Sequence, residues 1–160
     1  EVYHGEDIYV CHPNYITFSH LKKVNCDYTE CEVAGMPTPW VKALFHQERE
    51  VLLQAQARLL GQWGDRYEAI FSNPRYLELT AKGSNKGGGV ARVAELLGVA
   101  PEHIYCVGDN QNDIPMLELS AIPFAPANCA QEVKDWGARI LCHCNDGVIG
   151  AIVELLDGLY

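Results

Sequence analysis

The stretch that decides the fold is GDNQND, which runs from Gly108 to Asp113 and holds two carboxylates with carboxamides between them. It follows the apolar run HIYCV at residues 103–107, which predicts a buried strand. It precedes IPML at residues 114–117, which predicts the first turn of a helix. In a doubly wound sheet, ligands bind at the carboxyl ends of the strands, so Asp109 is well placed to meet a ligand or an ion.

Two residues of this stretch also have a purely structural interpretation. Asp113 is typical of a helix N-cap or of a first-turn acid, and Asn112 could equally be a cap. The same carboxylates could instead bind Mg²⁺, since a protein usually supplies one or two carboxylate ligands to this ion and water and phosphate complete the octahedron. The stretch alone therefore leaves both a helix start and a magnesium site open.

Strands and helices alternate through the second half of the chain. We expect strands at residues 103–107, 121–125 and 138–142, and helices at residues 86–98, 113–119, 129–136 and 147–158. This alternation predicts right-handed crossovers and a parallel sheet with flanking helices, an α/β arrangement of the Rossmann type.

The first half has a different order and predicts a small α+β unit. We expect a hairpin at residues 1–10, a short helix at 13–24, mostly loop at 25–39, a strand at 40–45, a helix at 46–62, and strands at 66–72 and 76–81. The pattern changes near residue 80, so we expect one domain over residues 1–79 and a second over residues 80–160.

Composition excludes several classes of function. The 160 residues are 48% hydrophobic and 21% charged, which is typical of a globular protein. A net charge of -9 argues against a nucleic-acid partner, because counterion release needs clustered Lys and Arg. No apolar run reaches the roughly 20 residues that span a bilayer, and no signal peptide is visible. Seven cysteines do not form a disulfide framework, so we expect reduced thiols and a cytoplasmic protein.

A second cluster, AKGSNKGGG at residues 81–89, opens the helix expected from residue 86. Glycine beside a helix N-terminus lets an anion approach backbone N–H groups, and a lysine there can pair a phosphate oxygen. The spacing is neither that of a P-loop nor that of a dinucleotide fold. Taken alone, this cluster is more typical of a solvated loop.

Together the two clusters resemble the C-terminal part of a haloacid dehalogenase (HAD) superfamily phosphatase of the Cof type. The resemblance rests on KGSNKGGGVARVAELLGVAPEHIYCVGDNQNDIPML, then APANCAQEVKDWGARIL, then NDGVIGAIVELL, and it covers residues 76–158 in unbroken order. The first half more loosely resembles the α+β cap that this type inserts into its core. The resemblance implies a Mg²⁺-dependent phosphomonoester hydrolase that acts on a small phosphorylated metabolite such as a sugar phosphate.

The resemblance also implies roles for individual residues. Lys86 matches the basic residue that holds the phosphoryl group and the nucleophile, with Lys82 as the competing lysine. Asp109 matches the acidic Mg²⁺ ligand, and Asp113 matches the second acid of that metal motif, in an outer-shell position. Their chemistry suits phosphoryl transfer, which mostly needs positioning and neutralisation of developing charge.

Two carboxamides complete the implied site. Asn112 matches a residue near the substrate or a metal-bound water. Asn128 lies where the family often has an asparagine in a loop that faces the site. Both are therefore candidate substrate-binding residues beside Lys86.

The nucleophile that the resemblance implies is missing. The family attacks phosphorus with an aspartate in a DxDxT-like motif, and no two of the eight aspartates in this chain are two residues apart. We interpret the chain, whose first residue is Glu, as a C-terminal fragment that is inactive alone. The alternative is a non-catalytic remnant that binds Mg²⁺ and a phosphorylated ligand or serves as an interaction module.

Two further expectations follow from the pattern. A fragment of this kind lacks the central strand of the core sheet, which exposes the neighbouring strands. We therefore expect the chain to depend on the missing segment or on a partner chain, or to self-associate. Cys142-His143-Cys144 with Cys26 and Cys31 could form a zinc site on paper, but the spacing is not that of a zinc ribbon, and buried or edge thiols are the default.

Overall fold

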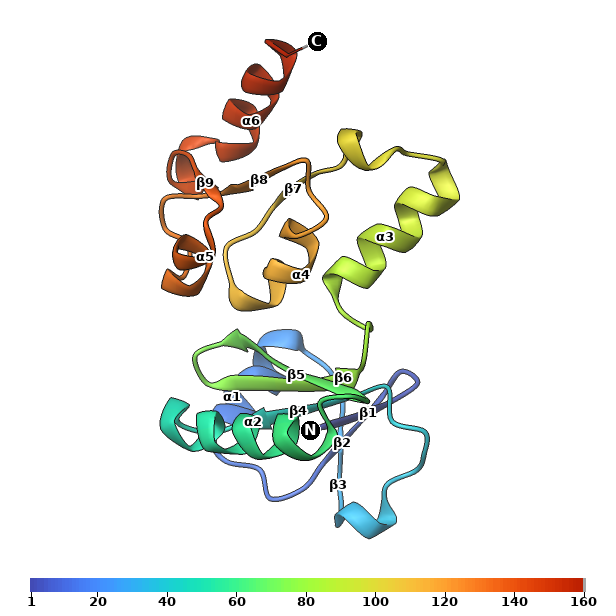
Figure 1. Cartoon of the computed structure of the whole chain (residues 1–160). Coiled ribbons are helices and arrows are strands. Elements are labelled where there is room, and N and C mark those ends of the chain that lie inside the picture. Colours follow the sequence, from blue (N-terminus) through green and yellow to red (C-terminus); the bar gives the residue numbers. More distant parts are fainter. Residues whose placement is uncertain (160) are drawn as a thin grey trace. The chain divides into compact units, whose positions relative to one another are not determined.

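The computed structural model describes residues 1–159 and divides into two compact units, Glu1–Ser84 and the part from Asn85 onward. Figure 1 follows the chain through both. The boundary expected near residue 80 falls inside the last strand of the first unit. Together the units form an α/β protein with one mixed six-stranded sheet and one parallel three-stranded sheet.

The first unit is built on the mixed sheet, in the order β3-β2-β1-β4-β6-β5. Its elements are β1 (Val2–His4), β2 (Asp7–Val10), α1 (Tyr15–Val24), β3 (Thr29–Glu30), β4 (Lys42–His46), α2 (Arg49–Trp63), β5 (Tyr67–Asn73) and β6 (Tyr76–Ala81). The expected hairpin at residues 1–10 is confirmed, since β1 and β2 pair antiparallel around Gly5, whose φ of 58° suits a tight turn. β2 and β3 pair in parallel. This pairing could not be predicted, because β3 has only two residues and both are exposed.

Strand register places the two helices of this unit on opposite faces of the sheet. Val2 pairs with Ala43, so these two side chains lie on the same face of the sheet. Leu52 of α2 packs against that face. Tyr3 pairs with Ile8 on the other face, where Leu21 of α1 packs. Each face therefore has its own small core.

The second unit contains a parallel sheet in the order β7-β8-β9 with helices on both faces. Its elements are α3 (Lys86–Leu97), β7 (Tyr105–Val107), α4 (Ile114–Leu117), β8 (Ile122–Ala125), α5 (Gln131–Trp136), β9 (Arg139–Ile140) and α6 (Val148–Asp157). Ala125 faces a core with Leu117 and Val133, whereas Phe124 faces one with Ile152 of α6. The parallel sheet expected from the alternating pattern is confirmed.

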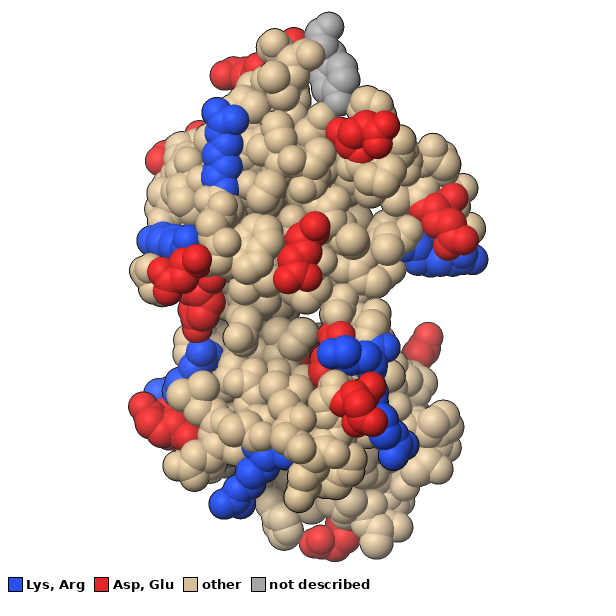
Figure 2. Space-filling model, viewed as in Figure 1, with Lys and Arg blue, Asp and Glu red and all other residues tan. Residues whose placement is uncertain are grey.

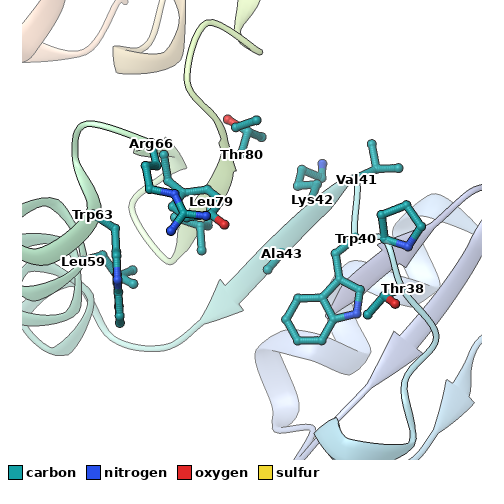
Figure 3. A pocket seen from close by; sticks show the side chains of 13 residues that line it. Thr38, Trp40, Val41, Lys42, Ala43, Leu59, Trp63, Arg66, Leu79 and Thr80 are labelled. Atoms are coloured by element: carbon teal, nitrogen blue, oxygen red, sulfur yellow. The ribbon is translucent and has the colours of Figure 1, made fainter.

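The three tryptophans are all partly exposed. Trp40, Trp63 and Trp136 are 43%, 44% and 36% exposed. Trp40 and Trp63 line a pocket of about 580 Å³ in the first unit, and Figure 3 shows their indole rings on either side of it.

The surface of the described residues fits the composition. Figure 2 shows acidic and basic side chains interspersed on the face in view, without an extended basic area. Among residues 1–159, none of the helices has both the length and the apolar character that crossing a membrane requires.

An apolar groove of about 550 Å³ in the second unit runs beside β7, which pairs with β8 on one edge only within residues 1–159. Val93 and Leu97 of α3 line it and are 55% and 72% exposed. Such a strand edge and apolar surface favour association. We therefore predict that the 160-residue chain self-associates, and that Val93→Lys with Leu97→Lys shifts it toward the monomer in light scattering after size exclusion.

The control is Val51→Lys, since Val51 is 52% exposed on α2 of the other unit. It should leave the association unchanged. A monodisperse wild-type monomer with a sharp thermal transition would show the prediction to be wrong.

Candidate functional site

The side chains of Asn110 and Asp113 organise the turn after β7. The N–H of Gly108 donates to the carbonyl oxygen of Phe124 at 3.1 Å, which ties the end of β7 to β8. The Oδ1 of Asn110 accepts the N–H of Gln111 at 2.9 Å, and Asn110 forms a capping box with Asp113. This capping explains why the chain turns here into α4.

Asp113 is the centre of the site. Its side chain is almost fully buried, and its Oδ2 accepts the backbone N–H groups of Asp109 at 2.8 Å and Asn110 at 3.0 Å. Its Oδ1 forms an ion pair with the Nζ of Lys86. Burial opposes ionisation, but the Lys86 ammonium and the two backbone donors outweigh it and hold the pKa of Asp113 below its ordinary value.

Two glycines allow the close contacts that bring Lys86 to Asp113. A Cβ on Gly108 would overlap the Asp113 side chain, and a Cβ on Gly87 would overlap the backbone of Pro115. Gly87 therefore lets the first turn of α3 lie against α4. Neither role follows from the sequence pattern, although Gly87 lies in the cluster at residues 81–89 and Gly108 in the stretch at residues 108–113.

Lys86 is the first residue of α3, and its side chain is half exposed. Asn85 precedes it as the N-cap, and its Oδ1 accepts the N–H of Gly88 at 2.9 Å. The competing lysine, Lys82, belongs to the first unit, where its Nζ lies 4.0 Å from Glu68. Lys86 is thus paired with Asp113 inside the second unit, and Lys82 with Glu68 inside the first.

Asp109 has a fixed backbone and a free carboxylate. Its N–H donates to Asp113 and its carbonyl oxygen accepts the N–H of Ala130 at 2.8 Å. Its side chain is exposed and makes no hydrogen bond or ion pair within residues 1–159. Both oxygens of Asp113 already accept hydrogen bonds from protein groups, so Asp109 is the carboxylate of this turn that could bind a cation directly.

The two candidate carboxamides lie in different settings. Asn112 is half-buried in the turn between Asp109 and Asp113. Asn128 is exposed, and its Oδ1 accepts the N–H of Cys144 at 3.0 Å. Asn128 therefore also holds the segment that leads to α6.

All seven cysteines are free thiols. Burial raises the pKa of Cys106 and of Cys129, which keeps these thiols protonated. Cys142 and Cys144 belong to neither of the two side-chain groups of residues 1–159 whose spacing could hold a metal ion.

Comparison with known proteins agrees with this geometry. The family model of the haloacid dehalogenase-like hydrolases matches residues 1–152. The chain belongs to this family. It covers roughly 58% of the full length of its structural homologues.

Individual relatives show how much of the protein the chain covers. It is 31% identical over 117 residues to the putative phosphatase YxeH of Bacillus subtilis, and 33% identical over 112 residues to a phosphoglycolate phosphatase of Methanopyrus kandleri. These matches cover 72% and 68% of this chain, and 43% and 48% of the relatives. The chain thus spans less than half the length of these relatives.

A solved structure shows the same fold. A HAD/COF-like hydrolase from Plasmodium vivax superposes with a TM-score of 0.80 at 19% identity, over 99% of this chain and 58% of that chain. At this identity, the likeness concerns the fold alone.

The two glycines of α3 offer a matched pair of variants. Gly87→Ala should lower the free energy of unfolding by about 1–3 kcal/mol, because the added methyl group meets Pro115. Gly89→Ala meets nothing within 4 Å and should be neutral or raise it by up to about 1 kcal/mol, since alanine favours helix. Urea unfolding measures both, and equal effects would contradict the close approach of α3 to α4.

Asp113 should also give stability a pH dependence. Its folded-state pKa is below the ordinary 3.8, so its charge stabilises the fold above that value and this contribution is lost as the pH falls through the folded-state pKa. Below about pH 4, the melting temperature of the wild type should therefore fall more steeply than that of Asp113→Asn. Parallel curves for the two proteins would show that the ion pair with Lys86 contributes nothing.

Proposed function

We propose that this chain supplies the phosphate-positioning and metal-binding part of a Mg²⁺-dependent phosphomonoester hydrolase. The observation that carries the proposal is the arrangement of Lys86, Asp113 and Asp109 at the end of β7. One buried carboxylate orients an ammonium group and, through the backbone, a free carboxylate. This gives a positive and a negative group with different tasks.

Lys86 would bind the phosphoryl group. Its ammonium is paired with Asp113 yet half exposed, so it can also meet a phosphate oxygen as a point charge. Asp113 holds it in place through the ion pair. Phosphoryl transfer depends mostly on such positioning and on neutralisation of charge on the oxygens.

Asp109 would hold Mg²⁺ directly, with Asp113 in an outer-shell position. The ion, when bound, neutralises charge on the phosphoryl oxygens. Asn112, in the same turn, would lie near the substrate or a metal-bound water. Asn128 would contribute a polar group to the substrate from the neighbouring loop.

The substrate would be a small phosphorylated metabolite, such as a sugar phosphate. This rests on the family and on the relative from Methanopyrus kandleri, whose name gives phosphoglycolate, a small phosphorylated acid. The net charge of -9 disfavours a nucleic acid as the partner.

The chain alone should not hydrolyse its ligand. The resemblance assigns attack on phosphorus to an aspartate of a DxDxT-like motif, and no two aspartates of this sequence have that spacing. A segment that completes the core would have to bring the nucleophile. The second candidate function, favoured by this missing motif, is binding of Mg²⁺ and a phosphorylated ligand without hydrolysis.

The test is a phosphatase assay on the product of the complete native gene, with a panel of small phosphate esters. We predict that Asp109→Asn and Lys86→Ala each lower kcat/KM by about 10²-fold or more, because they remove charge stabilisation of the transition state. Lys82→Ala, the competing lysine, is the matched control and should change it by less than about threefold.

Either of two results would overturn the assignment. Equal losses in Lys82→Ala and Lys86→Ala would remove the distinction between the lysines. Activity that is undiminished by removal of Mg²⁺ with a chelator would exclude the metal. A complete product without activity, which still binds Mg²⁺ through Asp109, would favour the non-catalytic function.

A further inference from the structure

Three side chains from separate elements of the first unit converge on one point. Glu1 precedes β1, His20 lies on α1, and His46 ends β4. The Oε1 of Glu1 lies 3.0 Å from the Nδ1 of His20 and 3.5 Å from the Nδ1 of His46, and one ligand atom of each residue lies within 4.8 Å of the others. No role in phosphoryl transfer has been assigned to these residues.

The cluster is buried and held in place. The side chains of Glu1, His46 and His20 are 0%, 2% and 13% exposed. Glu1 and Leu44 exchange two backbone hydrogen bonds of 2.8 Å each, which fixes Glu1 beside β4. The ring of Tyr76 meets both imidazoles edge-on, at centroid distances of 5.2 Å to His20 and 4.8 Å to His46.

His46 makes no hydrogen bond with either ring nitrogen within residues 1–159, although both nitrogens are buried. Its Nδ1 lies 3.5 Å from the Oε1 of Glu1, and this approach is not counted as a hydrogen bond. A buried polar group without a partner is costly. A metal ion bound to a ring nitrogen would supply such a partner.

The donor spacing fits a transition metal. Ligands at about 2.0–2.2 Å from a tetrahedral ion lie roughly 3.3–3.6 Å from one another. The 3.5 Å spacing between Glu1 and His46 lies in this range, and the 3.0 Å spacing between Glu1 and His20 is slightly shorter. The hydroxyl of Tyr3 donates to Oε2 of Glu1 at 2.8 Å, which is how an outer-shell group orients a metal-bound carboxylate. Two imidazoles and one carboxylate form a donor set that suits Zn²⁺.

The geometry points to a Zn²⁺ site in the first unit, held by the carboxylate of Glu1 and the imidazoles of His20 and His46, with water as the fourth ligand. The ion joins the start of β1, the helix α1 and the end of β4, and it supplies the partner that His46 lacks. It lies apart in sequence from Lys86 and Asp109, and it does not rest on the proposed phosphatase function. Mg²⁺, which prefers oxygen ligands, does not replace it.

A metal-free network is the competing explanation. Glu1 would then simply accept hydrogen bonds from Tyr3 and His20, and His46 would remain unpaired. A second group, Cys11, His12 and Glu32, also has metal-ligand spacing but is more exposed. The test must separate these two groups.

The experiment titrates the metal-free 160-residue chain with Zn²⁺ by calorimetry, in the presence of excess Mg²⁺, and with Co²⁺ by visible absorption. All variants carry Cys11→Ser and His12→Gln, which remove the exposed group. We expect one Zn²⁺ per chain, tetrahedral Co²⁺ bands, and a loss of affinity of at least 30-fold in His20→Gln and in His46→Gln. His4→Gln, on the same sheet, is the control and should bind like the parent.

Stability gives a second readout. At a free Zn²⁺ concentration of 100 times Kd, the unfolded population of the parent should fall about 100-fold, with a rise in melting temperature of about 5–10 °C. His20→Gln should lose this rise, whatever its metal-free melting temperature, because the comparison is made with and without Zn²⁺ on the same variant. The result for His46→Gln counts only if the circular dichroism of this variant matches that of the parent. If the spectra differ, the result for His20→Gln decides the test.

The inference is overturned if the parent binds no Zn²⁺ at micromolar concentration. It is also overturned if both histidine variants bind as tightly as the parent, or if binding disappears with Cys11→Ser and His12→Gln alone. Phosphatase activity has no part in these outcomes, so failure of the zinc site and failure of the proposed function are separate results.

Discussion

The rest of the site depends on the carboxylate of Asp113. It is buried, and its charge is balanced by Lys86 and by two backbone N–H groups of the same turn. Removal of any of these partners would leave a buried charge less well compensated, at a cost of about 1–3 kcal/mol. One side chain thus joins the start of α3 to the end of β7, which are far apart in the sequence.

This arrangement separates structure from chemistry. Asp113 is fully occupied with protein donors, so it orients other groups and has no free oxygen for a ligand. Lys86 and Asp109 are exposed enough to meet one, a cation and an anion at the end of the same parallel sheet. The proposal of Mg²⁺ and a phosphorylated metabolite as ligands rests on this pair of charges.

The sequence predicted the alternation of strands and helices in the second unit, because apolar runs and caps are local signals. It also predicted Lys86 over Lys82 for the phosphoryl role, an assignment that came from the resemblance. Periodicity could not predict the exposure of Trp40 and Trp63, since packing across an element depends on distant neighbours. Gly87 is needed because α3 and α4 pack closely, and Glu1 meets His46 because two distant strands pair. Local sequence patterns carry no information about such contacts between distant segments.

The most direct test of the central claim is the coupling between Mg²⁺ and phosphate on the 160-residue chain. Calorimetric titration with inorganic phosphate, with and without saturating Mg²⁺, measures it. The account predicts that Mg²⁺ tightens phosphate binding, that Asp109→Asn abolishes this effect, and that Lys86→Ala weakens binding under both conditions while Lys82→Ala does not. Phosphate binding that is independent of both Mg²⁺ and Lys86 would contradict it.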